Sequence, residues 1–303
     1  MSLQYDAFFD IRHYECDAFG HVNHGVYLQW MQEAALRALA SAGFDITHPR
    51  PDQPIFQMSE NDITYYKPLT YGDAVRVCTR VIEATQAHIR NEYIIHDAAS
   101  GEIAAKGISQ WVLMAGDTLE TLPIPESLIQ VLQPGGVATT PAPEPFPPAP
   151  PPPEFVYTLT RAVEWRDLDF SRLVNGAAYM YFLENISWRA GEALGWPMTR
   201  MMAMGQGFVA RRYRTLYLHP ARLGDVLRVA TWAGRPRRAT GMRYYTIHHA
   251  ESGRLLVRAQ ALWVWVNFKT GLPQRIPRAL LDDFAPNIAK LSEVEQVSKS
   301  TVG

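Results

Sequence analysis

The stretch CDAFGHVNHGVYLQWMQEAALRALASAGFD, residues 16–45, places an aspartate, a histidine and an asparagine directly before a segment with helical periodicity. Apolar side chains recur in that segment at three- and four-residue spacing, which predicts one buried helix face: Tyr27, Trp30, Met31, Ala34 and Ala38. Gly43 marks the expected end of the helix, because glycine readily adopts the left-handed backbone that closes helix C-termini.

The same pattern occurs a second time, at a constant offset of 152 residues. The matches include Asp17 with Asp169, Asn23 with Asn175, Gly43 with Gly195, Tyr65 with Tyr217, Pro68 with Pro220, Tyr93 with Tyr245 and Trp111 with Trp263. A register that holds over this length without a gap indicates a tandem duplication.

A proline-rich segment separates the two copies. Residues 134–153 contain 10 prolines in 20 positions. Proline is excluded from helix interiors and central strands, so this segment is predicted to be an extended linker. We therefore expect a first domain over residues 1–133, a second over 154–288 and a C-terminal tail over 289–303.

Each copy is predicted to contain a short strand, the helix and then several antiparallel strands. In the first copy the strands are expected at residues 8–14, 63–66, 74–83, 88–96 and 103–114, and the second copy is expected to begin with a strand at 159–165. This order of elements predicts the α+β class, with a curved antiparallel sheet wrapped around its helix.

Composition narrows the classes of protein. The chain has 303 residues, of which 47% are hydrophobic and 19% charged, as in ordinary soluble domains. It contains no apolar run of membrane-spanning length and no secretory signal at its start, so we expect a cytoplasmic protein without a membrane partner. Its two cysteines, Cys16 and Cys78, provide neither a disulfide framework nor a set of metal ligands.

The motifs CDAFGHVNHGVYLQWMQEA, YYKPLTYGDAVRV and SGEIAAKGISQWVLM together resemble the hotdog-fold thioesterases, within them the 4-hydroxybenzoyl-CoA and acyl-ACP thioesterase branch. The resemblance covers nearly all of both copies. It implies two tandem hotdog domains that form a pseudo-dimer within one chain, and hydrolysis of an acyl thioester whose acyl group lies between them.

The residues before the helix suit that chemistry. Asp17 is placed to attack a carbonyl or to activate water, and His21 to orient water, share the proton or help bind the thioester. Asn23 is suited to the N-cap, with the backbone amides of His24 and Gly25 as expected oxyanion donors at the positive end of the helix dipole. Base and oxyanion donors would then converge on one carbonyl group.

The second copy retains only part of this set. Asp169, Asn175 and Gly176 correspond to Asp17, Asn23 and His24, whereas Leu173 replaces His21 and Arg172 replaces Gly20. If an aspartate and helix amides suffice, both copies are active. If the histidine is required, the second copy supplies only binding surface. We favour one complete site, in the first copy.

Two further helix residues are candidates for substrate contacts, Tyr27 and Glu33. For Glu33, a solvated helix face and a second active-site acid are equally good interpretations. Cys16 lies beside Asp17, but its counterpart is Leu168, which argues against a nucleophilic cysteine.

The two copies also differ in charge. Residues 1–150 carry 8 Lys and Arg against 18 Asp and Glu, a balance of −10, and residues 151–303 carry 21 against 12, a balance of +9. Opposite charges favour pairing of one copy with the other. Alternatively, Arg235, Arg237 and Arg238 receive the phosphates of coenzyme A or an acidic carrier protein.

Other functions receive less support. The segment GQGFVA, residues 205–210, is expected to follow a helix and enter a strand, the reverse of the order in dinucleotide sites. We expect no cofactor, no metal and no nucleic-acid partner. The leading function is hydrolysis of acyl-CoA or acyl-ACP. The alternatives are an enoyl-thioester hydratase or dehydratase and a non-catalytic acyl-thioester-binding module. A homodimer or higher oligomer of the double-domain chain remains open.

Overall fold

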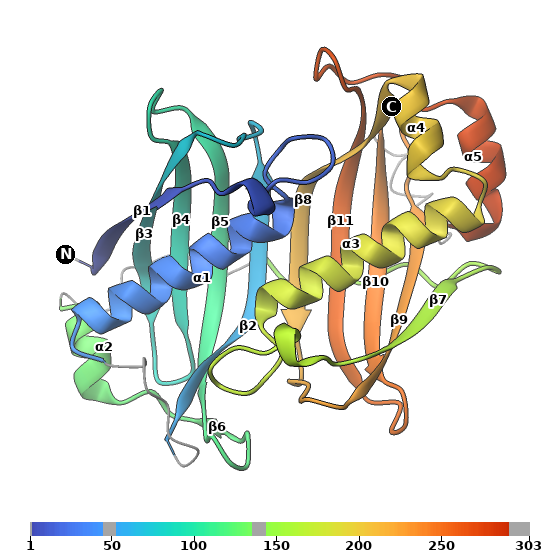
Figure 1. Cartoon of the computed structure of the whole chain (residues 1–303). Coiled ribbons are helices and arrows are strands. Elements are labelled where there is room, and N and C mark those ends of the chain that lie inside the picture. The colour runs from blue at the N-terminus through green and yellow to red at the C-terminus, as the bar shows by residue number, and fades with distance from the viewer. Residues whose placement is uncertain (1, 45–52, 135–143, 291–303) are drawn as a thin grey trace, which may run out of the picture. The chain divides into compact units, whose positions relative to one another are not determined.

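The computed structural model describes residues 2–44, 53–134 and 144–290 (Figure 1). The chain separates into two compact units. Unit 1 comprises residues 1–145 and 164–180, and unit 2 comprises residues 146–163 and 181–303.

Unit 1 is built on an antiparallel sheet with a long helix across one face (Figure 1). Its strands pair in the order β1-β3-β4-β5-β2, and short β6 (Thr121–Leu122) pairs with β5. The main strands are β1 (Gln4–Asp10), β2 (Ile55–Tyr65), β3 (Ala74–Ala84), β4 (Ile89–Asp97) and β5 (Ile103–Met114). The helices are η1 (His13–Glu15), α1 (His24–Ser41) and α2 (Glu126–Leu132).

Helix α1 forms where its sequence pattern predicts it. Asn23 caps its first turn, and Gly43, just beyond its last turn, has a φ of +86°. Leu28, Met31 and Ala34 on its inner face are fully buried. Because burying one large apolar side chain contributes about 1.5–3 kcal/mol, this face holds the helix on the sheet.

Unit 2 repeats this architecture. Its strands pair in the order β8-β11-β10-β9-β12, and β7 also pairs with β9. They are β7 (Tyr157–Ala162), β8 (Gln206–Tyr217), β9 (Val226–Gly234), β10 (Thr240–His249), β11 (Leu255–Asn267) and β12 (Ile288–Ala289). The helical segments of the second copy are η2 (Trp165–Asp167), α3 (Gly176–Ala193), α4 (Met198–Met204), α5 (Arg278–Phe284) and η3 (Ala285–Asn287). Each unit therefore has the α+β arrangement expected of a hotdog domain.

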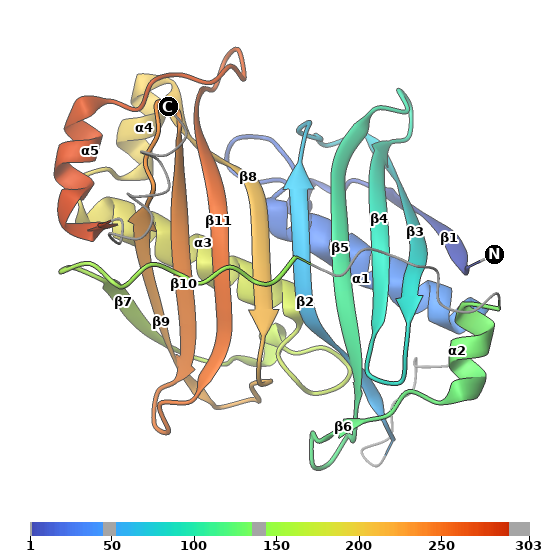
Figure 2. The same cartoon turned by 180° about the vertical axis from the view of Figure 1, so that it is seen from behind.

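The second half of the proline-rich linker packs on unit 2. Figure 2 shows this segment crossing the face of the sheet opposite α3. The guanidinium groups of Arg214 on β8 and Arg258 on β11 lie 5.3 and 5.2 Å from the centre of the Phe146 ring. Arg258 also donates a hydrogen bond to the Pro147 carbonyl at 3.4 Å. Residues 144–153 contain neither helix nor strand, as the prolines predict, but the segment is held by these contacts.

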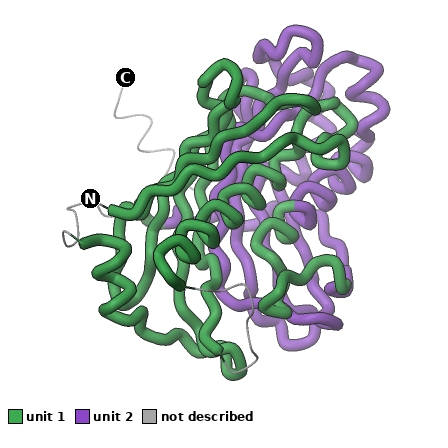
Figure 3. Tube along the Cα trace, turned by 60° about the vertical axis from the view of Figure 1, so that its left-hand side comes forward, with its two compact units in different colours: residues 1–145, 164–180 green, residues 146–163, 181–303 purple. Residues whose placement is uncertain are grey.

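The compact units do not coincide with the sequence repeats. Residues 164–180, which contain Asp169 and the start of α3, group with unit 1 although they belong to the second repeat (Figure 3). Residues 146–153 of the linker group with unit 2. The loop that precedes the second helix therefore packs with the sheet of the first repeat.

Several boundaries differ from the sequence-based expectations. The first strand ends at Asp10, and His13–Glu15 forms a 3-10 turn where the strand was expected to continue. The expected strand at 159–165 likewise ends at Ala162. Strand β2 starts at Ile55, so the expected strand at 63–66 covers only its end. Ala289 belongs to β12, and the tail beyond residue 290 lies outside the described residues. No helix in the described residues is long and apolar enough to cross a membrane.

Candidate active site

Asp17 folds back the backbone of the loop that precedes α1 in the first repeat. Its Oδ1 accepts a hydrogen bond from the Phe19 amide at 2.8 Å, which forms an Asx turn. Its own amide donates to the His21 carbonyl at 2.8 Å, so the two candidate catalytic residues flank one tight turn. Gly20 occupies that turn with a φ of +78°, a conformation that glycine adopts without steric cost.

The asparagine at the end of this loop caps α1. Asn23 Oδ1 accepts the Gly25 amide at 2.8 Å, as its predicted N-cap role requires. The Gly25 amide is consequently engaged in the cap, which corrects the expectation that it is an open oxyanion donor. The Tyr65 hydroxyl donates to the His24 carbonyl at 3.0 Å and fixes the first turn.

The Pro-x-x-x-Gly-Asp turn between β2 and β3 packs against this loop. The Val22 amide donates to the Leu69 carbonyl at 2.8 Å, and His21 forms a bridge with Thr70. Asp73 closes the turn by accepting the Thr70 amide at 2.9 Å. This contact explains physically why the two motifs occur together: the turn holds His21 in place.

A buried acid in each repeat supports the start of the loop, and the sequence analysis missed both. Glu15 accepts the Arg12 amide at 2.7 Å through its side chain and the Asn23 amide at 2.9 Å through its carbonyl. Asp167 occupies the matching place in the second repeat, where its carbonyl accepts the Asn175 amide at 2.9 Å. The matched acid in both repeats, Glu or Asp, is the signal that could have identified them.

Tyr27 is a core residue rather than an open substrate contact. Its side chain is 3% exposed, and its ring packs at 5.3 Å from Tyr65 and 5.2 Å from Trp30. Burial raises the pKa of the Tyr27 hydroxyl, and burial also raises the pKa of the Cys16 thiol. A raised thiol pKa disfavours the thiolate, in agreement with the argument against Cys16 as a nucleophile.

Glu33 lies on the outer face of α1. Its Oε1 is 2.6 Å from Arg37 Nε, and both side chains are nearly half exposed. It is nine residues from His24, about 14 Å along the helix. The structure therefore supports the solvated-face interpretation, and the proposed substrate contact of Glu33 is corrected.

The loop of the second repeat holds its aspartate more tightly. Asp169 Oδ1 accepts both the amide of Ser171, at 2.8 Å, and its hydroxyl in a short hydrogen bond, while Asn175 Nδ2 donates to Oδ2 at 3.5 Å. Burial raises the pKa of Asp169, although these hydrogen bonds oppose the shift. Asn175 caps α3 by accepting the Ala177 amide at 2.8 Å. Gly176 takes the first helical position, as His24 does in α1.

A residue of the first repeat reaches this second loop. Gln57 on β2 donates through Nε2 to Ser171 Oγ at 3.2 Å, and Ser171 in turn bonds to Asp169. All three residues belong to unit 1. No sequence pattern could indicate the contact, because Gln57 and Ser171 are 114 residues apart.

The arginine cluster is exposed in the connection between β9 and β10. Arg235, Arg237 and Arg238 are all exposed, and Arg235 has a φ of +49°. Backbone hydrogen bonds shape the segment: the Arg237 amide donates to Thr240 at 2.7 Å, and the Arg238 carbonyl accepts from Ile276 at 2.9 Å. The cluster belongs to unit 2, whereas the Asp17 loop belongs to unit 1.

Two further observations concern metal ligands and the GQGFVA segment. In the described part of the chain, no three His, Cys, Asp or Glu side chains are grouped so that they could hold a metal ion. The GQGFVA segment follows α4, passes through Gly205 in the left-handed conformation and enters β8, which confirms the helix-to-strand order.

Models of two protein families match the chain. The thioesterase-like superfamily matches residues 11–132, and the N-terminal domain of acyl-ACP thioesterases matches residues 154–284. The two matched segments lie on either side of the proline-rich linker.

Curated proteins and solved structures are also similar to this chain. A chloroplastic acyl-[acyl-carrier-protein] hydrolase of Cuphea viscosissima is 26% identical over 182 residues, 57% of this chain and 44% of that protein. The chain thus spans less than half the length of this relative. The 12:0-ACP thioesterase of Umbellularia californica has a TM-score of 0.66 at 19% identity, covering 87% of this chain and 95% of that one. A protein of Lactobacillus plantarum assigned as an oleoyl thioesterase has a TM-score of 0.70 at 17% identity, covering 91% of this chain and 98% of that one.

Proposed function

We propose that the protein hydrolyses acyl thioesters carried by acyl carrier protein or coenzyme A, because models of thioesterase families match both halves of the chain. The observation that carries the proposal is the loop of the first repeat. There an aspartate and a histidine flank one tight turn directly before a capped helix.

In the proposed reaction Asp17 acts on the thioester carbonyl carbon. As a general base it takes a proton from water, whose oxygen forms the new C–O bond. As a nucleophile it forms an acyl-enzyme anhydride that water then hydrolyses. In either route the C–S bond breaks, the carrier leaves as a thiolate that is protonated, and a free carboxylic acid is released.

The first turn of α1 stabilises the oxyanion in this proposal. The His24 amide, at the first helical position, is the assigned donor, and the positive end of the helix dipole adds to it. Asn23 acts through the cap, and Tyr65 acts through the His24 carbonyl, so both are positioning residues. His21 orients the water or shares its proton.

We propose that the carrier of the acyl group binds to the arginine cluster of the second repeat. The exposed Arg235, Arg237 and Arg238 present three positive charges on one short segment, which suits an acidic carrier protein or the phosphates of coenzyme A. The first repeat carries all of the proposed catalytic residues, whereas in the second repeat Ser171 holds Asp169 and Leu173 stands in place of His21.

The proposal is tested by a free-thiol release assay across a panel of acyl-ACPs and acyl-CoAs. Mass spectrometry of the products separates hydrolysis from the alternatives. Hydrolysis gives a free acid and thiol, whereas a hydratase changes the mass of an intact thioester by one water. Asp17→Asn serves as the matched control for contaminating activity. Thiol release that is absent from the whole panel, or equal in the variant, would overturn the assignment.

A further inference from the structure

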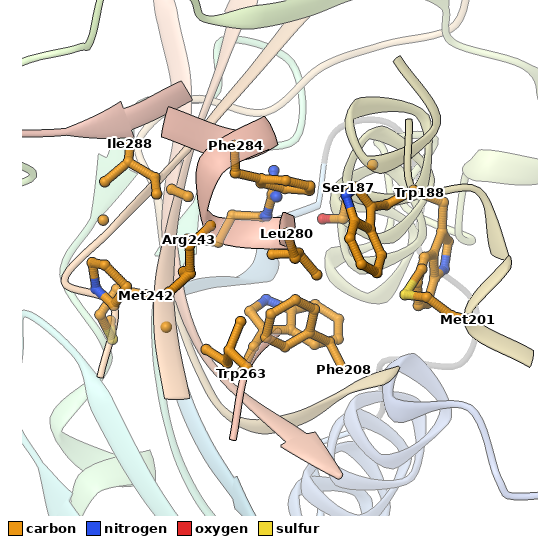
Figure 4. Close-up of a pocket in the computed structure, with 18 residues that line it drawn as sticks. Ser187, Trp188, Met201, Phe208, Met242, Arg243, Trp263, Leu280, Phe284 and Ile288 are labelled. Atoms are coloured by element: carbon orange, nitrogen blue, oxygen red, sulfur yellow. The ribbon is translucent and has the colours of Figure 1, made fainter. Parts of the chain in front are cut away.

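Unit 2 contains an apolar pocket between α3, α4, α5 and the sheet (Figure 4). It is partly open to solvent. Most of its wall is formed by large apolar side chains, among them Trp188, Trp263, Met201, Phe208, Leu280 and Phe284. Walls of this kind suit a hydrocarbon or aromatic body.

Arg243 is the one charged side chain among the described residues that line the pocket. It is 9% exposed. Its Nη1 donates one long hydrogen bond to Thr231 Oγ1 at 3.4 Å, and its guanidinium lies 5.8 Å from the centre of the Phe284 ring. In the described part of the chain no Asp or Glu forms an ion pair with it. Burial lowers the pKa of Arg243, because it removes water from around the cation.

A buried guanidinium has five N–H donors and is costly to leave without an anion. The neighbouring hydroxyl groups do not supply one. Tyr245 is bonded to Ser187 at 2.8 Å and to Tyr213 at 3.3 Å, and these groups are neutral. The position therefore lacks a negative partner that a ligand would provide.

The first repeat shows that the fold does not require this arrangement. Asn91 stands where the second repeat has Arg243, and it donates to the Tyr93 hydroxyl at 3.3 Å. Ile89, which is 1% exposed, stands where the second repeat has Gly241. The two positions are equivalent in the sheets: Ile89 pairs with Trp111 and Gly241 with Trp263. The second repeat thus has a glycine where the first has a bulky side chain, and a cation two residues further along the same strand.

We propose that this pocket binds a carboxylic acid with a hydrocarbon body, its carboxylate paired with Arg243 and its apolar part among the tryptophans. A guanidinium matches a carboxylate by two parallel N–H···O bonds. A monoanion fits better than a phosphate dianion, because only one cation is present and the remaining wall is apolar.

The approach to the pocket also favours an anion. Pro236 lines the pocket and lies between Arg235 and Arg237 in the exposed segment after β9. Three exposed arginines on the segment that contributes Pro236 to the pocket would raise the local concentration of anionic ligands. The inference goes beyond the proposed hydrolysis, since binding of a free acid can be measured whether or not the protein cleaves thioesters.

Binding is tested with the full chain and two matched ligands, 11-bromoundecanoate and 11-bromoundecanol. Bromine quenches tryptophan fluorescence on contact, and Trp188 and Trp263 line the pocket. Calorimetry with undecanoate gives the affinity. We expect saturable quenching by the acid and weaker binding of the alcohol, which has the same body but no charge.

Two variants locate the site. Arg243→Met replaces the cation with an apolar side chain of similar length. It should weaken undecanoate binding by about 10- to 100-fold and leave the affinity for undecanol nearly unchanged. Gly241→Ile introduces the residue of the first repeat. A Cβ there would have no atom within 4 Å and no backbone strain, so the variant should fold and lose both ligands. Arg254→Met, an exposed arginine of unit 2, is the control.

The carboxylate could belong to a free acid or to the far end of a dicarboxylic acyl thioester. Turnover of decanoyl and 9-carboxynonanoyl thioesters by Arg243→Met distinguishes these sources. A KM that rises only for the carboxylated thioester indicates the substrate, and unchanged KM values indicate a free acid. Undecanoate binding that is absent from the parent protein would overturn the proposal. Binding that is as strong in Arg243→Met and Gly241→Ile as in the parent protein would also overturn it.

Discussion

The loop of residues 17–25 and the loop of residues 169–177 have the same hydrogen bonds from backbone amides to side chains, but different side chains at their tips. The matched bonds are Asp17 to Phe19 and Asp169 to Ser171, each 2.8 Å, and Asn23 to Gly25 and Asn175 to Ala177, each 2.8 Å. The aspartate and asparagine therefore shape the loop in both repeats. Their presence in both repeats is explained by folding alone, so it does not by itself make the second loop a catalytic site.

The two loops differ in the side chains at three matched positions. Leu173, which is 3% exposed, replaces His21, and Ser171 gives Asp169 a hydroxyl partner that Phe19 cannot give Asp17. Arg172 has a φ of +63° where Gly20 has +78°. The second loop thus keeps the strained turn although it lacks both the glycine that relieves the strain and the histidine.

The largest expected effect is a fall in kcat that differs between the two aspartates. Asp17→Asn keeps an oxygen that can accept the Phe19 amide but removes the base, so kcat should fall by about 10²- to 10⁴-fold. Asp169→Asn should have a smaller effect. Thiol-release kinetics measure both, with thermal midpoints as the control for folding. A larger loss for Asp169→Asn would assign the chemistry to the second loop, and equal partial losses would mean two working sites.

The next effect concerns the histidine. His21→Leu places the residue of the second repeat in the first and should lower kcat by no more than about 10²-fold, less than Asp17→Asn. The backbone bond between Asp17 and the His21 carbonyl does not depend on the side chain, so the loop should keep its shape. The pH dependence of kcat/KM provides a second readout. Undiminished activity would show that an aspartate and helix amides suffice, and the second loop would then be expected to work.

A moderate effect is expected from the charge difference between the repeats. Replacing Arg235, Arg237 and Arg238 with alanine should raise KM by about three- to tenfold, and more at low salt than at high salt, because exposed charges are screened. The comparison requires acyl-ACP and acyl-CoA substrates at two ionic strengths. An unchanged KM at low salt would favour the alternative that the opposite charges serve pairing of the two copies.

The smallest effect concerns backbone strain. Gly20→Arg places a side chain in the left-handed region and should lower the free energy of unfolding by about 1 kcal/mol. The cost is purely conformational, since a Cβ at Gly20 would have no atom within 4 Å. Arg172→Gly should change stability by less, since relieved strain is offset by greater freedom of the unfolded chain. Denaturant midpoints measure both. Equal stability of Gly20→Arg and the parent would show that the turn carries no strain.

Much of the fold could be predicted because its elements depend on local patterns. The helix over 24–41 follows from its apolar spacing, from Asn23 at its start and from Gly43 beyond its end. Strands β3, β4 and β5 follow from alternation and turn residues, and the structure confirms each of them. Short elements such as α2, α4 and α5, each of seven residues, were not predicted, because so short a helix forms only when packing stabilises it.

The sequence by itself determined the duplication, the α+β class and the position of the reactive loop, since these depend on residue spacing along the chain. Only the tertiary structure decided that Gln57 reaches Ser171, that Glu33 faces solvent beside Arg37 and that Tyr27 is buried. It alone also showed that Arg243 lines an apolar pocket without an acidic partner among the described residues. Contacts between distant segments depend on how sheet and helix pack, and in one sequence no periodicity records which side chains then meet.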